Sequence, residues 1–146
     1  MISLIYDRTE GDVREARVFR ASGRNIAERL KGCYDHIDRN RVGQAVNELA
    51  TWMRNNGYRT NAHGFIGWQK DSLVTRELGE EMLDSVAAVR RDLVVFPDTP
   101  QLPPTLFKMN HNDANALERI LASMQTMTEW IEWSRNLYFS DITFHG

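Results

Sequence analysis

Reactive side chains stand near one another at several places in the sequence. Cys33 and His36 could supply a nucleophile and its base, and the stretches 35–38 and 111–113 each combine a histidine with acids that could bind a metal. A nucleophile needs its base close in space, and helical metal ligands need a shared face, which adjacent residues lack. No second histidine lies four residues from either one. We therefore interpret Cys33 as a small buried residue and both stretches as polar turns that cap helices.

Two pairs of acids and one pair of glycines are the remaining candidates for chemistry. Acid–base catalysis needs two carboxylates that converge in a cleft, whereas Glu80 with Glu81, and Glu129 with Glu132, fit a solvated helix face better. The Gly-Phe-Ile-Gly sequence at 64–67 lacks a following Lys-Ser or Lys-Thr and matches no phosphate-binding motif. We expect no enzyme, no cofactor and no metal.

Arginines are frequent near the start of the chain. Acids are interleaved with them, so the pattern favours a helix surface with ion pairs over a nucleic-acid site. Over the whole chain, 18 basic residues stand against 20 acidic ones, and the formal net charge of -2 gives no strong basic field. We expect no nucleic-acid partner. The arginines concerned are Arg14, Arg17, Arg20, Arg24 and Arg29.

Length and composition indicate one domain spanning residues 1–146. A chain of 146 residues falls in the usual range for a single domain and can bury about two thirds of its unfolded surface. Its one cysteine excludes an intrachain disulfide. The longest apolar run covers 93–96, far short of the roughly 20 residues that span a membrane, so we expect no membrane partner.

Apolar periodicity predicts three longer helices. The clearest covers 39–56, with apolar residues on one face, Asp38 as the N-cap and Gly57 as a left-handed C-terminal stop. A second runs from its cap at Thr75 to Pro97, and a third runs from Asn110 or Asn112 to near Asn136.

Shorter elements complete the prediction. A helix capped by Thr9 should end at Gly23, and a second short segment covers 25–31. Residues 57–71 read as a loop whose aromatic side chains hold it to the core. The segment 97–104 holds all four prolines and should be a stiff, extended connector.

Both ends of the chain are rich in residues that favour β-structure. Residues 2–6 and 138–144 could each form an edge strand, and 137–146 is a candidate C-terminal docking strand. The terminal strands could pair with a neighbouring chain, or they could pair with each other or pack on the core, and we give the two possibilities equal weight. Tryptophan and tyrosine are enriched in interface centres. The candidate contact residues are Trp130, Trp133, Tyr138, Phe139, Ile142 and Phe144.

Several stretches spread over nearly the whole chain form a recognisable pattern. They are Ile5–Thr9 with Asp12-Val13, Leu30–Tyr34, Asp38–Val42 with Ala45-Val46, Leu102-Pro103, Ala114–Glu118 with Ile120-Leu121, and Tyr138–Ile142. Together they resemble a family of small proteins encoded in the tail-gene region of phages and prophages of Gram-positive bacteria. The sequence differs from the family pattern in the loop 57–68 and at its end, where Ser-Asp-Ile-Thr-Phe replaces a doubled Tyr-Ser-Gly-Glu phrase.

The resemblance implies a virion structural component of the tail tip, baseplate or fibres, and it implies no catalytic residues. With the helix pattern, it leads us to expect an all-α or mostly α fold: a small helical bundle with short β elements at the termini. We expect a homo-oligomer in the phage tail, made in the host cytoplasm, that docks onto other virion tail, baseplate or fibre proteins without catalysis. The alternatives are a nucleic-acid-binding regulatory or packaging factor and a cell-wall-binding module.

Overall fold

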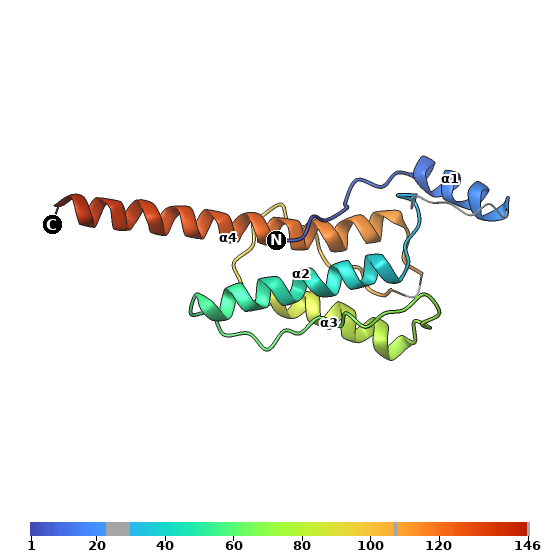
Figure 1. The fold of residues 1–146 in the computed structure, drawn as a ribbon, viewed down its shortest axis with the longest axis horizontal. Coiled ribbons are helices and arrows are strands. Elements are labelled where there is room, and N and C mark those ends of the chain that lie inside the picture. The colour runs from blue at the N-terminus through green and yellow to red at the C-terminus, as the bar shows by residue number, and fades with distance from the viewer. Residues whose placement is uncertain (23–29, 107, 146) are drawn as a thin grey trace.

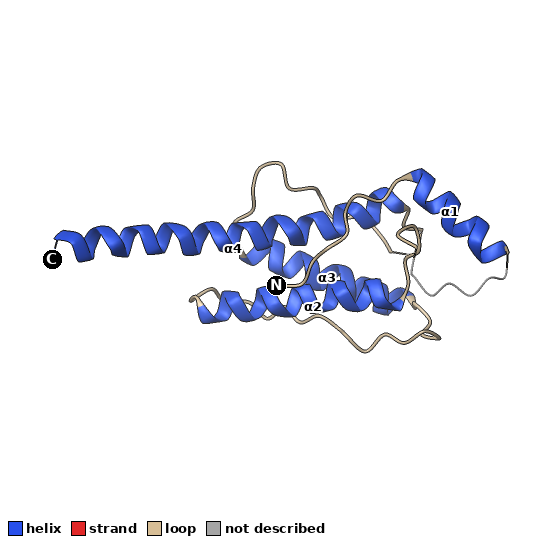
Figure 2. Cartoon of the chain, turned by 45° about the horizontal axis from the view of Figure 1, so that its top comes forward, coloured by secondary structure: helices blue, strands red, loops and turns tan. Residues whose placement is uncertain are grey.

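The computed structural model describes the backbone of residues 1–22, 30–106 and 108–145, and the side chains of these ranges as far as Leu137. These described residues form four helices, which follow one another along the chain (Figure 1). They are α1 (Glu10–Ala21), α2 (His36–Asn55), α3 (Arg76–Asp92) and α4 (His111–His145). The described residues form no strand (Figure 2). The predicted mostly α fold is confirmed.

Three of the helices form the core, because α2, α3 and α4 each pack against the other two. Their apolar stripes meet in one cluster, in which Val46, Leu49, Val86 and Leu121 are fully buried. In Figure 1, α1 stands at one end of this bundle and the C-terminal half of α4 extends past the other end. The fold therefore has a compact centre and two projecting helical parts.

Helix α2 begins earlier than its sequence pattern predicts. Asp35 is the N-cap, and its side chain accepts a hydrogen bond of 2.9 Å from the backbone N–H of Ile37. Asp38 sits one turn into the helix and accepts from the Asp35 backbone N–H at 2.8 Å, which completes a capping box. The prediction of Asp38 as the cap was wrong because its side chain points inward to two arginines. The predicted stop at Gly57 is confirmed by its φ of 84°.

The caps of the other helices agree with the sequence. Thr9 caps α1 and Thr75 caps α3, as predicted. Asn110 caps α4 by accepting from the Asp113 N–H at 2.9 Å, and Asp113 accepts from the Asn110 N–H in return. Helix α3 ends at Asp92, several residues before Pro97. The expected short helix at 25–31 lies almost wholly outside the described residues.

The predicted terminal strands are not seen. Residues 1–9 form an extended arm that lies along the bundle (Figure 1). Side chains replace a partner strand: the N–H groups of Ile2 and Ile5 donate to the carboxylates of Glu48 and Glu118 at 2.8 and 3.1 Å. The arm is thus bound to helices, which satisfy its backbone without a sheet.

The C-terminal segment is helical where a strand was predicted. Helix α4 continues to His145, well past the expected end near Asn136. No glycine or proline occurs between His111 and His145 to interrupt it. The preference of residues 138–144 for β-structure is weak. The 27 preceding residues of α4 already form a helix, and extending a helix is far easier than starting one.

The segment between α2 and α3 is a loop held close to α2, as predicted. Trp68 is buried, and its backbone N–H and C=O pair with the Asn40 side chain at 3.0 and 2.9 Å. Asn47 pairs in the same way with the backbone of Gly64. Phe65, in contrast, is largely exposed. Two side-chain amides on α2 hold this loop together with Trp68 and with Tyr58, which packs against the core, so two of its three predicted aromatic residues anchor it.

Candidate functional site

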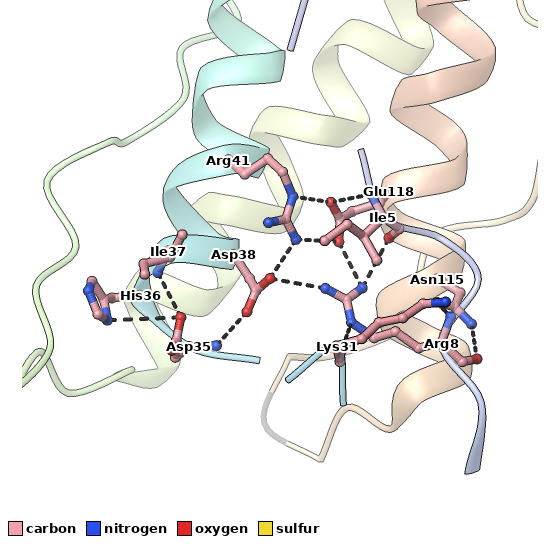
Figure 3. Close-up of polar contacts among 10 residues, drawn as sticks. All are labelled: Ile5, Arg8, Lys31, Asp35, His36, Ile37, Asp38, Arg41, Asn115 and Glu118. Atoms are coloured by element: carbon pink, nitrogen blue, oxygen red, sulfur yellow. Dashed lines mark hydrogen bonds and ion pairs between the residues drawn. The ribbon is translucent and has the colours of Figure 1, made fainter. Parts of the chain in front are cut away.

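Four charged side chains meet where the N-terminal arm crosses α2 and α4 (Figure 3). Arg8 comes from the arm, Asp38 and Arg41 from α2, and Glu118 from α4. Arg8, Asp38 and Glu118 are buried, with Glu118 fully so. We call these four residues the ion network. Two guanidinium groups balance two carboxylates, so the network carries no net charge.

Each charge in the ion network has opposite partners at short distance. The two terminal nitrogens of Arg8 lie 2.9 Å from Glu118 and 3.0 Å from Asp38. Arg41 contacts Glu118 through Nε at 2.7 Å and also binds Asp38. The remaining N–H groups of Arg8 include donors to the backbone carbonyls of Lys31 and Ile5. Such pairing is what makes buried charge tolerable.

The two carboxylates of the ion network favour the charged form of Arg41. Burial opposes the charge of Arg41, but its hydrogen bonds with Glu118 and Asp38 outweigh burial and hold the Arg41 pKa above its usual value. Burial, reinforced by the nearby carboxylates, raises the pKa of Tyr34 above its usual value. The Tyr34 ring lies over the Arg8 guanidinium at 5.3 Å. The network joins the arm to α2 and α4 and thus clamps the arm to the bundle.

Sequence reasoning overlooked the ion network. All four members lie in stretches that carry the family resemblance, and the three stretches that contain them meet at this point of the fold. The available signal was the position of these residues in the apolar periodicity. Glu118 adjoins Leu117 on the buried face of α4, and Asp38 lies one turn before Val42 on the buried face of α2. A charged residue in a buried phase implies a partner, but it does not say which one.

The residues considered for catalysis do not form a reactive cluster. Cys33 is partly buried, and His36 lies 3.9 Å from Asp35 at the start of α2. Glu80 and Glu81 are exposed, as a solvated face requires. Across the described ranges, no group of three or more His, Cys, Asp or Glu side chains could hold a metal ion. Within these ranges, no helix has the length and apolar character to cross a membrane.

The predicted contact residues Trp130 and Trp133 lie on α4 beside the end of α2, where α4 leaves the bundle. They are 59% and 63% exposed. Leu137, seven residues after Trp130 and four after Trp133, is 52% exposed. The three lie roughly opposite Thr128, which faces the bundle and is buried. We call Trp130, Trp133 and Leu137 the apolar stripe. The side chains of Tyr138, Phe139, Ile142 and Phe144 lie outside the described residues, although their backbone is helical.

Contacts with the end of α2 and with Phe96 hold α4 where it leaves the bundle. Glu132 accepts a hydrogen bond of 2.6 Å from the indole N–H of Trp52 at the end of α2, and Arg135 donates to Asn56. Phe96 packs edge-on against Trp130 with ring centroids 5.9 Å apart. The apolar stripe is therefore presented on a held helix, and Trp133 makes no ring contact within the described structure.

The hydroxyl of Tyr34 gives a prediction about stability. It is buried and has no hydrogen-bond partner among the described residues. We expect Tyr34→Phe to leave the free energy of unfolding unchanged or to raise it by up to about 1 kcal/mol, because an unpaired buried polar group is removed. Tyr34→Ala, which also removes the ring from Arg8, should lower it by roughly 3 kcal/mol. Urea denaturation followed by circular dichroism measures both, and a marked loss in Tyr34→Phe would show that the hydroxyl is paired.

Comparisons with family models, with curated proteins and with solved structures found no match to this chain.

Proposed function

We propose that this chain is a virion structural protein of a phage tail or baseplate, acting by protein–protein docking without catalysis. The observation that carries the docking role is the apolar stripe, which is exposed on α4 where this helix leaves the bundle and lies roughly opposite the buried Thr128. The assignment to a phage tail comes from the sequence resemblance. The partners are other tail, baseplate or fibre proteins, together with further copies of the chain.

The ion network supports this role by making the body rigid. It joins the arm, α2 and α4 at one end of the bundle, while Trp52 and Asn56 hold α4 at the other. A stripe on a rigid support loses little conformational freedom when it binds, so more of the burial energy appears as affinity. Tryptophan side chains of this kind dominate the energy of many interfaces.

Trp133→Ala tests the docking role. The side chain is 63% exposed, so the monomer should lose no more than about 0.5 kcal/mol of stability. If Trp133 anchors an interface, its loss should weaken docking by about 2 kcal/mol, roughly thirtyfold. We expect the variant to fold normally and to be strongly depleted from purified particles, as measured by quantitative mass spectrometry of virions.

Leu73→Ala is the matched control, because Leu73 is 82% exposed but lies in the loop before α3. It should be incorporated at the wild-type level. Equal incorporation of both variants would show that the apolar stripe does not dock. Retention of the wild-type chain on purified peptidoglycan, lost in Trp133→Ala, would instead favour the cell-wall-binding alternative, in which tryptophan stacks on sugars.

A further inference from the structure

A cleft lies between α1 and the start of α4. Figure 1 shows that α1 stands at the end of the bundle opposite to the C-terminal part of α4. Its volume is about 540 Å³, within the range of sites that take small molecules. One wall is the first half of α1, and the other is the chain entering α4 at Met109 and His111. Tyr34 and Gly32 lie between the walls.

Two contacts fix the walls relative to each other. A Cβ atom on Gly32 would lie 2.0 Å from the carbonyl oxygen of Asp12, so the turn at Gly32 touches the first turn of α1 directly. The backbone of Arg8, just before α1, pairs in both directions with the Asn115 side chain of α4 at 3.0 and 2.8 Å. The cleft is thus a built feature of the fold, anchored by the same arm as the ion network.

The α1 wall carries two arginines that form no ion pair among the described residues. Arg14 and Arg17 line the cleft one turn apart on α1, and both are exposed. The ion pairs expected along this helix are not present among the described residues. Asp12 instead caps its own helix by pairing with Thr9, which lowers the Asp12 pKa. Glu10 is the one carboxylate in the described lining.

The rest of the lining is suited to an organic molecule with a charged group. Val13, Met109 and Ala114 give an apolar surface beside the arginines. His111 adds a hydrogen-bonding group from the opposite wall. The first turn of α4 is already capped by Asn110, so a bound molecule would be held by side chains and not by the helix terminus.

We propose that this cleft binds a small organic anion, with Arg14 and Arg17 pairing with its carboxylate or phosphate group and the apolar lining holding its carbon skeleton. This inference is independent of docking through α4. Guanidinium groups form paired hydrogen bonds with either anion, so both groups share the required chemistry.

Isothermal titration calorimetry of the full chain with succinate and with glycerol phosphate tests the proposal. We expect saturable binding of at least one, and the tighter of the two identifies the preferred group. Arg17→Gln should weaken that binding about tenfold, because a charge-assisted hydrogen bond is lost. Glu10→Gln should strengthen it severalfold by removing the opposing charge.

Arg54→Gln is the matched control, because Arg54 is exposed in the last turn of α2, outside the cleft lining. It removes the same charge from the chain and should leave the affinity unchanged. Absence of saturable binding of both anions overturns the proposal. So does an affinity that Arg17→Gln does not change, or that Arg17→Gln and Arg54→Gln reduce equally, since attraction would then depend on total charge.

Discussion

Replacing Glu118 with glutamine is expected to lower the free energy of unfolding by about 3–5 kcal/mol, the largest effect of any single polar substitution considered. The carboxylate is fully buried and pairs with both Arg8 and Arg41. Glutamine has nearly the same shape, but it leaves two buried guanidinium groups with Asp38 as the remaining carboxylate of the ion network. It also points amide hydrogens at arginine donors.

Urea denaturation monitored by circular dichroism measures this loss. Glu80→Gln is the control: Glu80 pairs with Arg76 at 3.2 Å on an exposed face, and its change should stay within about 0.5 kcal/mol. Amide hydrogen exchange should also become faster at Ile5 and Arg8, whose N–H groups bind Glu118 and Asn115. If Glu118→Gln lowers the free energy of unfolding by less than about 1 kcal/mol, the ion network does not stabilise the fold as proposed.

Gly43→Ala is expected to lower the free energy of unfolding by about 1–3 kcal/mol, although alanine is the better helix former. Gly43 lies inside α2, and a Cβ atom there would come 2.1 Å from the carbonyl oxygen of Phe65. Gly64 makes the same close approach from the loop side, with a Cβ at 2.1 Å from the Gly43 carbonyl oxygen. The added methyl group must therefore push the loop away from α2.

Gly79→Ala is the opposite case on α3. Gly79 is also helical, but the nearest atom to its added Cβ is 3.6 Å away, an ordinary contact. It should raise the free energy of unfolding by up to about 1 kcal/mol through helix propensity alone. Thermal denaturation of the two variants should give midpoints that move in opposite directions. If Gly43→Ala also raises the free energy of unfolding, the loop does not pack against α2 as closely as the structure has it.

Local signals located the helices well. The apolar spacing of α2, the caps at Thr9 and Thr75, and the stop at Gly57 each depend on a few neighbouring residues, and the structure confirms them. The errors came where a local preference competed with something distant. Asp38 has the right residue type for a cap, yet Arg8, 30 residues earlier in the chain, draws it inward.

The candidate sites show the same division. Trp130 and Trp133 could be singled out from residue type and position, and their exposure is now observed. The cleft beside α1 could not be foreseen, because it depends on how Gly32 meets the backbone of Asp12. The sequence also could not show that, within the described part of the chain, the arginines of α1 form no ion pairs, because it does not reveal which of the interleaved acids are engaged in caps.

The amino-acid order by itself determined the number and faces of the main helices, since periodicity and capping act within one or two turns of chain. Tertiary structure alone decided how the two ends behave. The arm is held by carboxylates of α2 and α4, and the last residues continue a helix that packing had already stabilised. β-propensity is weak and depends on context. At the C-terminus an already formed helix outweighs it, and at the N-terminus the carboxylate acceptors on α2 and α4 do.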